Sequence, residues 1–448
     1  MMSKYKRYAI VIILVTNGIL ISFLESFIPI PIPVPGVKLG LGNIITMIGI
    51  AFLGVRDVLF IVAVRCFVVA VLTRGVMMLA FSLTGGLLSA LAMALLYKKF
   101  ANVFSVKGIS IVGALVHSTA QVVVASFVLG QFVIMYYLPV LLVSAVITGF
   151  ITGSIGEIAI DKIRKADVFN RKNEEIPETP LALLDSGDGA AKVEVEPKHF
   201  VPKMDSGIKF FIAVVLSVIP FFCEQQMSFF IISAYLILVT MFSGIRVKTV
   251  LTSFTAYFIV VVFPFLFGLL MSWVFYKVSG NAMFTSYMQV GKTVLRMFQL
   301  FLLWYIGCIY FNTTPMKSVI GLFDKLLTPL KRLGVPISEH LKVVMCVVRE
   351  LTELGPEVKR NFTESMESLP SKNNKNTWLS KINIKGISTI LVNFIVNSFK
   401  RLDIIEQYVR EVEAKDLYNY RFRLSVRDIV ACVSCILLMV VLSMIELG

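Results

Sequence analysis

Five polar residues in the first part of the chain have side chains suited to holding a small ligand. They are Lys38, Asn43, Arg65, His117 and Gln121. Lys38 and Asn43 belong to the segment Pro35-Gly-Val-Lys-Leu-Gly-Leu-Gly-Asn43, whose proline and glycines interrupt regular helix and leave backbone amides free. Free amides together with the lysine charge favour an anionic or hydrogen-bonding ligand. The alternative is a structural turn in which Lys38 reaches the lipid headgroups.

The other three of these residues lie inside apolar runs, and each has two interpretations. Arg65 is a charge within a stretch long enough to span a bilayer, so it must face protein or a wet cavity. It contacts either a phosphate, carboxylate or hydroxyl of a ligand, or backbone carbonyls of the protein. His117 and Gln121 are four residues apart and therefore share a helix face. A hydrogen bond between packed helices and a contact to the ligand are both open for this pair.

A charged, amphipathic stretch, Phe311 to Glu357, lies between the long series of apolar segments and the last one. Apolar residues recur there at helical spacing, while Lys and Glu fill the other face, so helices in this stretch must bury a stripe against something. We expect one helix after Pro315 and another after Pro336. An ordinary cytosolic loop domain and helices lying flat on the membrane are the alternatives.

The composition is that of a membrane protein with many spans. The 448 residues are 57% hydrophobic and 16% charged, and the mean hydropathy is +0.83. About eleven apolar segments are expected to cross the bilayer, about six of them before the composition changes at residue 166. Lys and Arg gather on the loops of one side, which explains the net charge of +15 without a nucleic-acid partner. This placement predicts the cytoplasmic membrane, an internal N-terminus and an external C-terminus.

An abrupt change of composition divides the chain into two domains. Residues 166–202 are rich in Glu, Asp, Pro, Gly and Ala and are expected to form a flexible acidic linker without a core. The linker separates a first domain, residues 1–165, from a second domain, residues 203–448, whose amphipathic helices occupy about residues 315–425. The predicted fold is an all-α polytopic membrane protein with about six spans in the first domain and about five in the second.

Several distinctive motifs run through the first domain: the segment Pro35 to Asn43, Asn17, Glu25, the run Ser82 to Gly86, and His117 with Gln121. On these motifs the domain resembles the Gx transporter family. Members of that family are also labelled component I of heptaprenyl diphosphate synthase, and their fold looks like the substrate-binding S component of energy-coupling factor (ECF) vitamin transporters. The resemblance covers about residues 1–165 and implies a six-helix bundle that binds a small molecule.

The second domain has motifs of its own: Thr313-Thr-Pro315, Pro329-Leu-Lys-Arg-Leu-Gly-Val-Pro336, and Ser398-Phe-Lys-Arg401 with Asp403. On these motifs it resembles the T component of ECF transporters, the transmembrane coupling subunit. In that family the corresponding region forms cytoplasmic coupling helices that rest on two ATPase subunits, so the resemblance implies two cytosolic ECF ATPases as partners. The candidate coupling residues are Arg349, Met366, Leu369, Lys400, Arg401, Arg410 and Lys415.

The coupling motifs depart from the family's pattern. T components carry an Ala-Arg-Gly motif near the end of each of two coupling helices, and its arginine meets a groove on an ATPase. The first motif would fall near residues 367–369, which contain no arginine, and the second has Lys415 in its place. Lysine supplies the charge without the forked hydrogen bonding of arginine. We therefore expect unequal docking, in which Arg410 and Lys415 make a charged contact and Met366 and Leu369 a weaker, apolar one.

The sequence contains no complete catalytic or metal-binding motif that we recognise. Gly291-Lys-Thr293 has the tail of a phosphate-binding loop, but its first glycine is replaced by Ser286, and neither a prenyl transferase motif nor zinc spacing is present. We expect no enzyme activity, no covalently bound cofactor and no metal. The family resemblance implies a transporter component whose ligand is a flavin, exported for flavinylation of extracytoplasmic proteins. Import of another vitamin or of an isoprenoid precursor stays open, as does a non-transport scaffold assisting polyprenyl or quinone synthesis.

Overall fold

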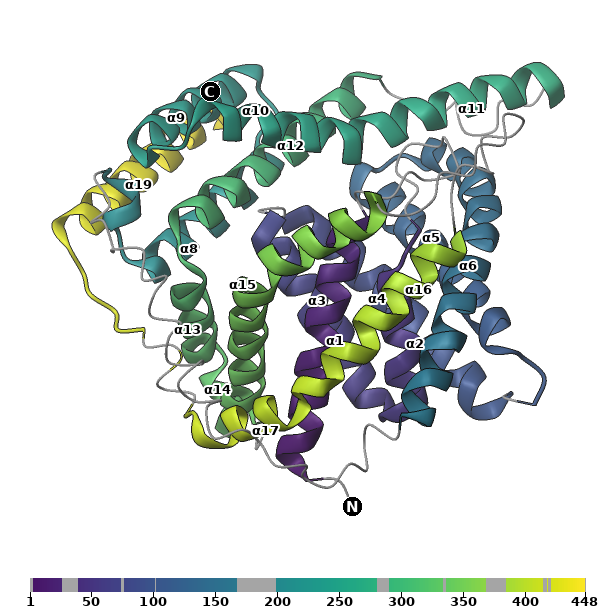
Figure 1. The fold of residues 1–448 in the computed structure, drawn as a ribbon. Coiled ribbons are helices and arrows are strands. Elements are labelled where there is room, and N and C mark those ends of the chain that lie inside the picture. Colours follow the sequence, from purple (N-terminus) through teal and green to yellow (C-terminus); the bar gives the residue numbers. More distant parts are fainter. Residues whose placement is uncertain are drawn as a thin grey trace.

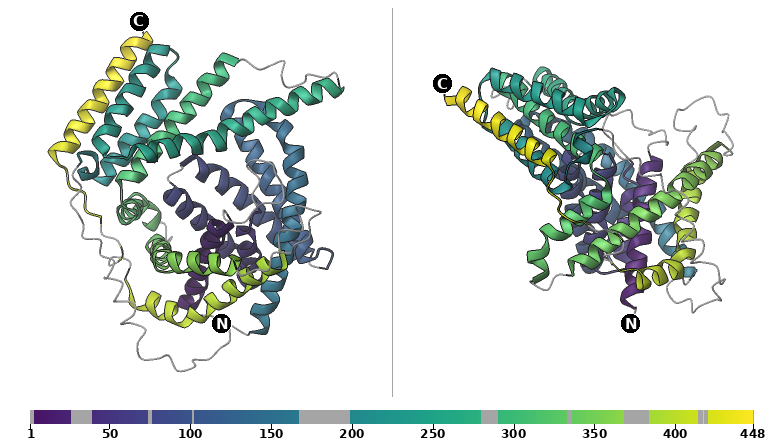
Figure 2. Two further views of the ribbon diagram at one scale, coloured as in Figure 1. Left: turned by 45° about the horizontal axis from the view of Figure 1, so that its top comes forward. Right: turned by 90° about the vertical axis from the view of Figure 1, so that its left-hand side faces the viewer.

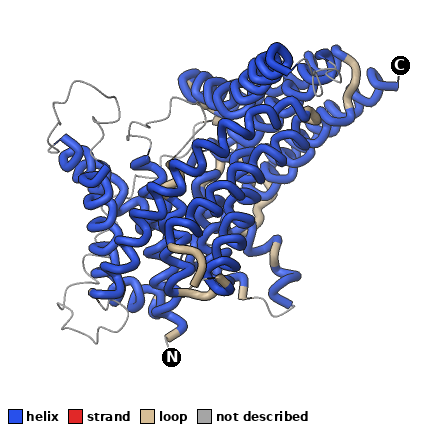
Figure 3. The backbone as a smooth tube through the Cα atoms, turned by 90° about the vertical axis from the view of Figure 1, so that its right-hand side faces the viewer, coloured by secondary structure: helices blue, strands red, loops and turns tan. Residues whose placement is uncertain are grey.

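The chain folds as an all-helical protein. The computed structural model describes residues 3–25, 39–73, 76–100, 102–166, 199–279, 290–332, 336–367, 384–413, 417 and 420–447. Every regular element within these ranges is a helix, as Figure 3 shows. The predicted all-α class is therefore confirmed.

Residues 1–165, predicted to be the first domain, contain a group of helices built around α1 (Lys4–Leu24). The other elements are α2 (Gly42–Phe52), α3 (Val55–Thr73), α4 (Val76–Lys99), α5 (Val106–Leu129), η2 (Phe132–Tyr137) and α6 (Leu138–Lys165). The α1 helix starts at Ser3, whose hydroxyl accepts a hydrogen bond from the Lys6 amide at 3.0 Å and so caps the first turn. Almost all α1 residues after its first turn are buried, because helices of both domains surround it.

The second domain begins with a bundle of apolar helices. They are η4 (Val201–Lys203), α8 (Ser206–Val218), η5 (Ile219–Phe222), α9 (Gln226–Ser243), α10 (Val247–Tyr257), η6 (Phe258–Val262), α11 (Phe263–Ser279) and α12 (Val290–Thr313), joined by the last helix, α19 (Val426–Leu447). The η6 segment is a single π-helical turn that joins α10 to α11 without a break. In Figure 1 this bundle occupies the top and left of the molecule.

Amphipathic helices connect α12 with α19. They are α13 (Met316–Leu326), α14 (Thr328–Arg332), α15 (Ile337–Glu367), α16 (Ile384–Ser398), η8 (Phe399–Arg401) and α17 (Leu402–Glu411). As predicted, α13 follows Pro315 and α15 follows Pro336. The α15 stripe is buried, with Val343 and Val347 both fully covered. Covering such a side chain removes it from water and contributes about 1.5–3 kcal/mol per residue.

Eight helices of the described residues are long and apolar enough to cross a membrane, which fits a multi-pass membrane protein. Each of the segments predicted to span lies on a helix, but α2, α3 and Ser206–Phe222 are not among these eight. The α2 helix has 11 residues and Ser206–Phe222 is likewise short; at 1.5 Å per residue, α2 covers roughly half of a 30 Å hydrocarbon core. The α3 helix carries three charges, Arg56, Asp57 and Arg65, and is not among the eight.

The two domains meet at two separate places, which the views in Figures 1 and 2 show from different sides. A large apolar core joins α1, α2, α3 and α6 to α15, α16 and α17. A smaller core joins α5 and η2 to α10, η6, α11 and α12. At the smaller one the backbones approach closely, because a Cβ on Gly268 would lie 3.0 Å from the carbonyl oxygen of Val133.

Candidate functional site

Glu25 holds the chain where it enters α2. Its carboxylate is 6% exposed and accepts hydrogen bonds from the backbone amides of Gly40, at 2.9 Å, and Leu41, at 3.2 Å. Gly40 has a φ of 72°, a left-handed conformation that glycine adopts without strain. A buried carboxylate and a glycine turn thus fix the start of α2.

Arg65 crosses from α3 to the contact between α1 and α2. Its Nη1 donates a hydrogen bond to the carbonyl oxygen of Gly42, and its Cδ lies 3.1 Å from the position a Cβ on Gly18 would take. Both glycines therefore make room for the arginine. Arg65 thus contacts a backbone carbonyl, which is one of the two interpretations open from the sequence. A contact to a ligand through its remaining guanidinium donors stays a prediction.

The remaining predicted ligand residues lie in different surroundings. Asn43 is half-buried in the first turn of α2, next to the Arg65 contact. His117 and Gln121 both face α4, where a Cβ on Gly85 would lie 3.0 Å from His117 Nδ1 and 3.1 Å from Gln121 Cγ. Lys38 lies outside the described residues. The geometry of the α5 pair fits close helix packing, whereas Arg65 is bound to Gly42, the residue that precedes Asn43.

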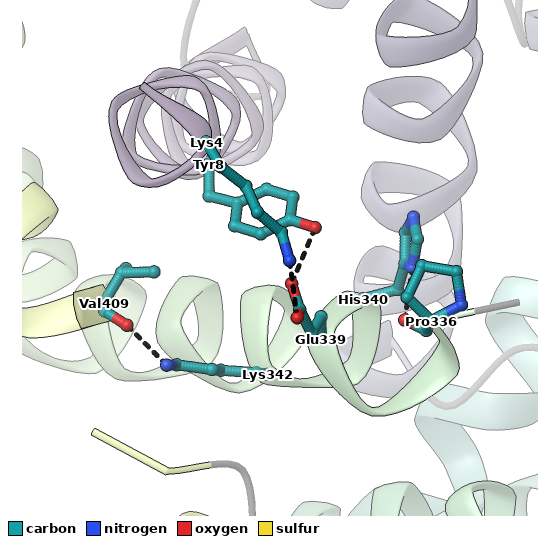
Figure 4. A network of polar contacts seen from close by, with 7 residues as sticks. All are labelled: Lys4, Tyr8, Pro336, Glu339, His340, Lys342 and Val409. Carbon is teal, nitrogen blue, oxygen red and sulfur yellow. Dashed lines mark hydrogen bonds and ion pairs between the residues drawn. The ribbon is translucent and has the colours of Figure 1, made fainter. Parts of the chain in front are cut away.

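The basic start of α1 is bound to α15 and α17, as Figure 4 shows for α15. Lys4 Nζ forms an ion pair with Glu339 at 2.6 Å, and the Tyr8 hydroxyl donates to the same carboxylate at 2.9 Å. Ser3 donates to Glu406 of α17 at 2.7 Å. Burial opposes the charged carboxylate, but the bonds from Lys4 and Tyr8 outweigh it and hold the pKa of Glu339 below its ordinary value.

The contact between the domains continues along α1 and onto its neighbours. Asn17 donates to Ser398 at 2.6 Å near the middle of α1. Ring contacts join α3 to the amphipathic helices, with centroids 4.7 Å apart for Phe60 and His340 and 5.6 Å apart for Phe67 and Phe323. A further polar contact between the domains joins Lys162 to Asn393 at 3.1 Å. Within the second domain, Figure 4 shows Lys342 bound to the Val409 carbonyl and His340 to the Pro336 carbonyl.

Two of the predicted coupling arginines are bound inside the chain. Arg349 pairs with Glu353 of the same helix at 2.8 Å and lies over the Tyr408 ring of α17, 4.2 Å from its centroid. Arg401 of η8 forms ion pairs with Glu350, at 2.9 Å, and with Glu353, at 3.6 Å. These contacts fasten η8 and α17 to α15.

The pKa values in this cluster follow from burial and charge. Burial opposes the charge of Arg349, yet the hydrogen bonds to Glu353 and Tyr408 give a net increase of its pKa. Glu350 is 7% exposed, and burial raises its pKa although Arg401 favours the ionised form. Arg349 also favours the ionised form of Glu350, whereas the neighbouring Glu353 opposes it.

The other predicted coupling residues lie at the surface or outside the described part. Arg410 has a 60% exposed side chain with an ion pair to Glu406 at 3.3 Å, and Lys400 is exposed. The backbone of Met366 belongs to α15, but its side chain is not described, and Leu369 and Lys415 lie outside the described residues. The unequal docking of ATPases therefore stays a prediction.

Sequence reasoning missed a polar cluster where α8, α12 and α19 begin or end. Asp205 caps α8 through the Gly207 amide at 2.8 Å and accepts from the Tyr420 hydroxyl. Asp428 is fully buried and accepts from the Asp205 amide at 2.8 Å and from Ser425. A buried acid at the start of an apolar span was the available signal. Glu339 was missed too, because a glutamate in the first turn of an amphipathic helix normally faces water.

No group of His, Cys, Asp or Glu in the described part of the chain is arranged to hold a metal ion. Arg65 with Gly42, and the junction of α1 with α15 and α17, are two of the polar arrangements in the described part of the first domain. The first offers guanidinium donors beside an irregular, glycine-rich turn, and the second is a charged contact between helices.

A model of the family described as heptaprenyl diphosphate synthase component I matches residues 14–158. The matched segment contains about half of α1, all of α2 to α5 and most of α6. No curated protein matches the chain. Residues 14–158 are thus similar to that family, which the motifs of the first domain had indicated, while the resemblance of the second domain to a T component gains no support from these comparisons.

Proposed function

We propose that the chain is the membrane component of an ECF-type transporter, in which the first domain binds the substrate and the second domain couples it to two separate ATPase subunits. The proposed substrate is a flavin, moved out of the cytosol. In this proposal the amphipathic helices and the linker are cytoplasmic, and ATP hydrolysis belongs to the partner subunits.

The position of α1 carries the proposal. At one end α1 borders the candidate ligand site, since Gly18 makes room for Arg65 and the Ser22 hydroxyl lies beside Gly42. At its other end α1 is bound to Glu339 of α15. Its 21 residues span about 32 Å as a continuous helix. A rigid element that contacts both sites is what coupling of ligand binding to the amphipathic helices requires.

The first test is co-purification from the native host in a mild detergent. ATPase subunits and a flavin should be retained by the wild-type chain, and the double variant Arg410→Ala, Lys415→Ala should lose most of the ATPase. The matched control is Lys98→Ala, Lys99→Ala, which removes two exposed basic residues at the end of α4 and should retain it. Equal loss in both double variants would contradict the proposed docking position.

The second test measures direction and substrate. Inside-out vesicles containing the chain and its co-purified ATPases should accumulate riboflavin, FMN or FAD when ATP is added, and Arg65→Ala should reduce accumulation while the folded yield is kept. Uptake of flavin by right-side-out vesicles, or uptake of another vitamin or an isoprenoid precursor, would favour import. If yield and transport fall together in Arg65→Ala, the arginine is structural.

A membrane scaffold that assists polyprenyl or quinone synthesis is the second candidate. Two observations favour it: the description of the family matched by residues 14–158, and the engagement of Arg349 and Arg401 in ion pairs within the chain. In this case the wild-type chain should co-purify with a prenyl transferase subunit and retain no ATPase. Co-purification of ATPases with ATP-dependent transport would exclude it.

A further inference from the structure

A cavity of about 280 Å³ lies inside the second-domain bundle, between α8, α9, α12 and α19. Its walls are almost wholly apolar, with Leu216, Leu236 and Ile306 in the interior and the small residues Ala213 and Ala431 on α8 and α19. The cavity belongs to a different domain from the Arg65 site. Apolar walls with a few polar groups are typical of ligand cavities, whereas water is poorly held there.

The mouth of the cavity opens on the outer surface of the bundle. Leu238, Phe242 and Val430 line the cavity and are each more than half exposed. They belong to α9 and α19, two of the helices apolar enough to cross a membrane. An occupant that enters there comes from the hydrocarbon of the bilayer, so it contains an apolar chain.

One end of the cavity is polar. Lys209 is 6% exposed, and its Nζ donates to the Thr313 carbonyl at 2.8 Å, which leaves two ammonium hydrogens for other acceptors. The Tyr310 hydroxyl is buried and has no hydrogen-bond partner within the described part of the chain. A buried donor without a partner is costly, and an occupant with oxygen acceptors at this end satisfies it.

Three further cations lie at the same end. Lys203 adjoins the lining residue Met204, Arg246 follows the end of α9, and Arg427 is in the first turn of α19. None of the three forms an ion pair among the described residues. Basic residues at the ends of spanning helices are typical contacts of anionic lipid headgroups.

The length of the cavity fits one leaflet. From Lys209 at the polar end to Leu216 along α8 there are seven residues, a rise of about 10 Å, which is less than half the 30 Å thickness of a hydrocarbon core. We propose that the cavity holds one acyl chain of an anionic phospholipid from the leaflet at this end of the bundle. The phosphate faces Lys203, Arg246 and Arg427, and the first oxygens of the chain face Lys209 and Tyr310.

The proposal is tested with the full chain purified in a mild detergent. Native mass spectrometry and lipid extraction should find one tightly retained phospholipid per chain. Ala431→Trp fills the cavity and should lower the retained lipid about tenfold, a difference of ~1.4 kcal/mol; Ala213→Trp provides the same test from α8. The matched control is Val433→Trp, on the exposed face of α19, which should leave retention unchanged.

The headgroup is tested separately. In nanodiscs that mix phosphatidylglycerol with phosphatidylcholine, the wild type should retain phosphatidylglycerol, and Lys203→Ala, Arg246→Ala, Arg427→Ala should lose the preference while still holding a chain. Retention of a quinone or polyprenyl lipid in place of phospholipid would overturn the assignment of the occupant. Equal retention in the wild type and both tryptophan variants, with Val433→Trp unchanged, would overturn the site itself.

Discussion

Replacement of Arg401 by methionine tests whether this residue is structural or a partner contact. In the folded chain Arg401 is the closest cation to Glu350, at 2.9 Å, and the Glu350 side chain is one-tenth exposed. The variant therefore leaves a buried carboxylate without its counter-ion, a change that costs about 3–5 kcal/mol in buried pairs. Glu350 avoids part of that cost by binding a proton.

Protonation sets an upper limit on the loss of stability. A glutamate with an unfolded pKa of about 4.3 is neutralised at pH 7 for ~3.7 kcal/mol and at pH 5 for ~1 kcal/mol. Burial raises the pKa of Glu350 in the folded protein. The contribution of Glu350 to the free energy of unfolding is therefore complete below its unfolded pKa and is lost as pH rises through its folded pKa. Arg401→Met raises this folded pKa further. We expect Arg401→Met to cost about 2–3 kcal/mol at pH 7 and less than ~1 kcal/mol at pH 5.

The assay is the thermal unfolding of the detergent-solubilised chain at both pH values. Adding Glu350→Gln to the variant should recover most of the loss at pH 7, because the amide removes the buried charge, and Arg401→Lys should give an intermediate value. An equal loss at pH 5 and pH 7, or no recovery with Glu350→Gln, refutes the reasoning. Unchanged stability with loss of a bound ATPase would instead make Arg401 a partner contact.

Three further predictions concern the contacts of the first domain. Glu339→Gln should weaken the attachment of α1 by about 0.2–1 kcal/mol, since the ion pair with Lys4 is partly exposed. The pKa of Glu339 is lowered in the folded protein, so the wild type should lose the same contribution as pH falls through that pKa. The loss should be seen as faster hydrogen exchange in α1. Gly42→Ala should displace the arginine and cost about 1–3 kcal/mol in thermal unfolding, whereas Gly156→Ala, with its nearest neighbour 3.8 Å away, should be neutral. Gly268→Val should lower the melting temperature by forcing α11 from η2; no change would refute close packing there.

The positions of the helices could be predicted because their signals are local. Pro315 and Pro336 precede α13 and α15, and apolar runs marked the apolar helices before residue 166, those from Ser206 to Thr313, and α19. The burial of α1 was not predictable, since a helix that is apolar all round has the same pattern whether lipid or protein surrounds it. That α2 ends at Phe52 could be predicted, because Gly54 and the charged residues Arg56 and Asp57 follow the apolar run.

The ion-pair partner of a charged residue could be predicted only where both residues lie on one helix, three or four residues apart. Arg349 and Glu353 are four residues apart, so their ion pair can be deduced from the sequence. Arg401 and Glu350 belong to different helices, and only the packing of η8 on α15 brings them together. A basic residue on an amphipathic helix therefore has the same sequence pattern whether it binds an outside partner or another helix of its own chain.

The two contacts between the domains differ in whether water or lipid would cover their surfaces after they separate. The contact of α1 with α15 and α17 buries apolar stripes of amphipathic helices, whose charged faces exclude them from hydrocarbon, so opening it exposes residues such as Val343 and Val347 to water. The contact of η2 with α11 lies between apolar helices, and lipid can cover the same surfaces at little cost. A rearrangement of the first domain therefore loses less free energy by opening at η2 and α11 than by leaving α15. If the first domain opened in this way, α1 would keep its contacts with Glu339 of α15.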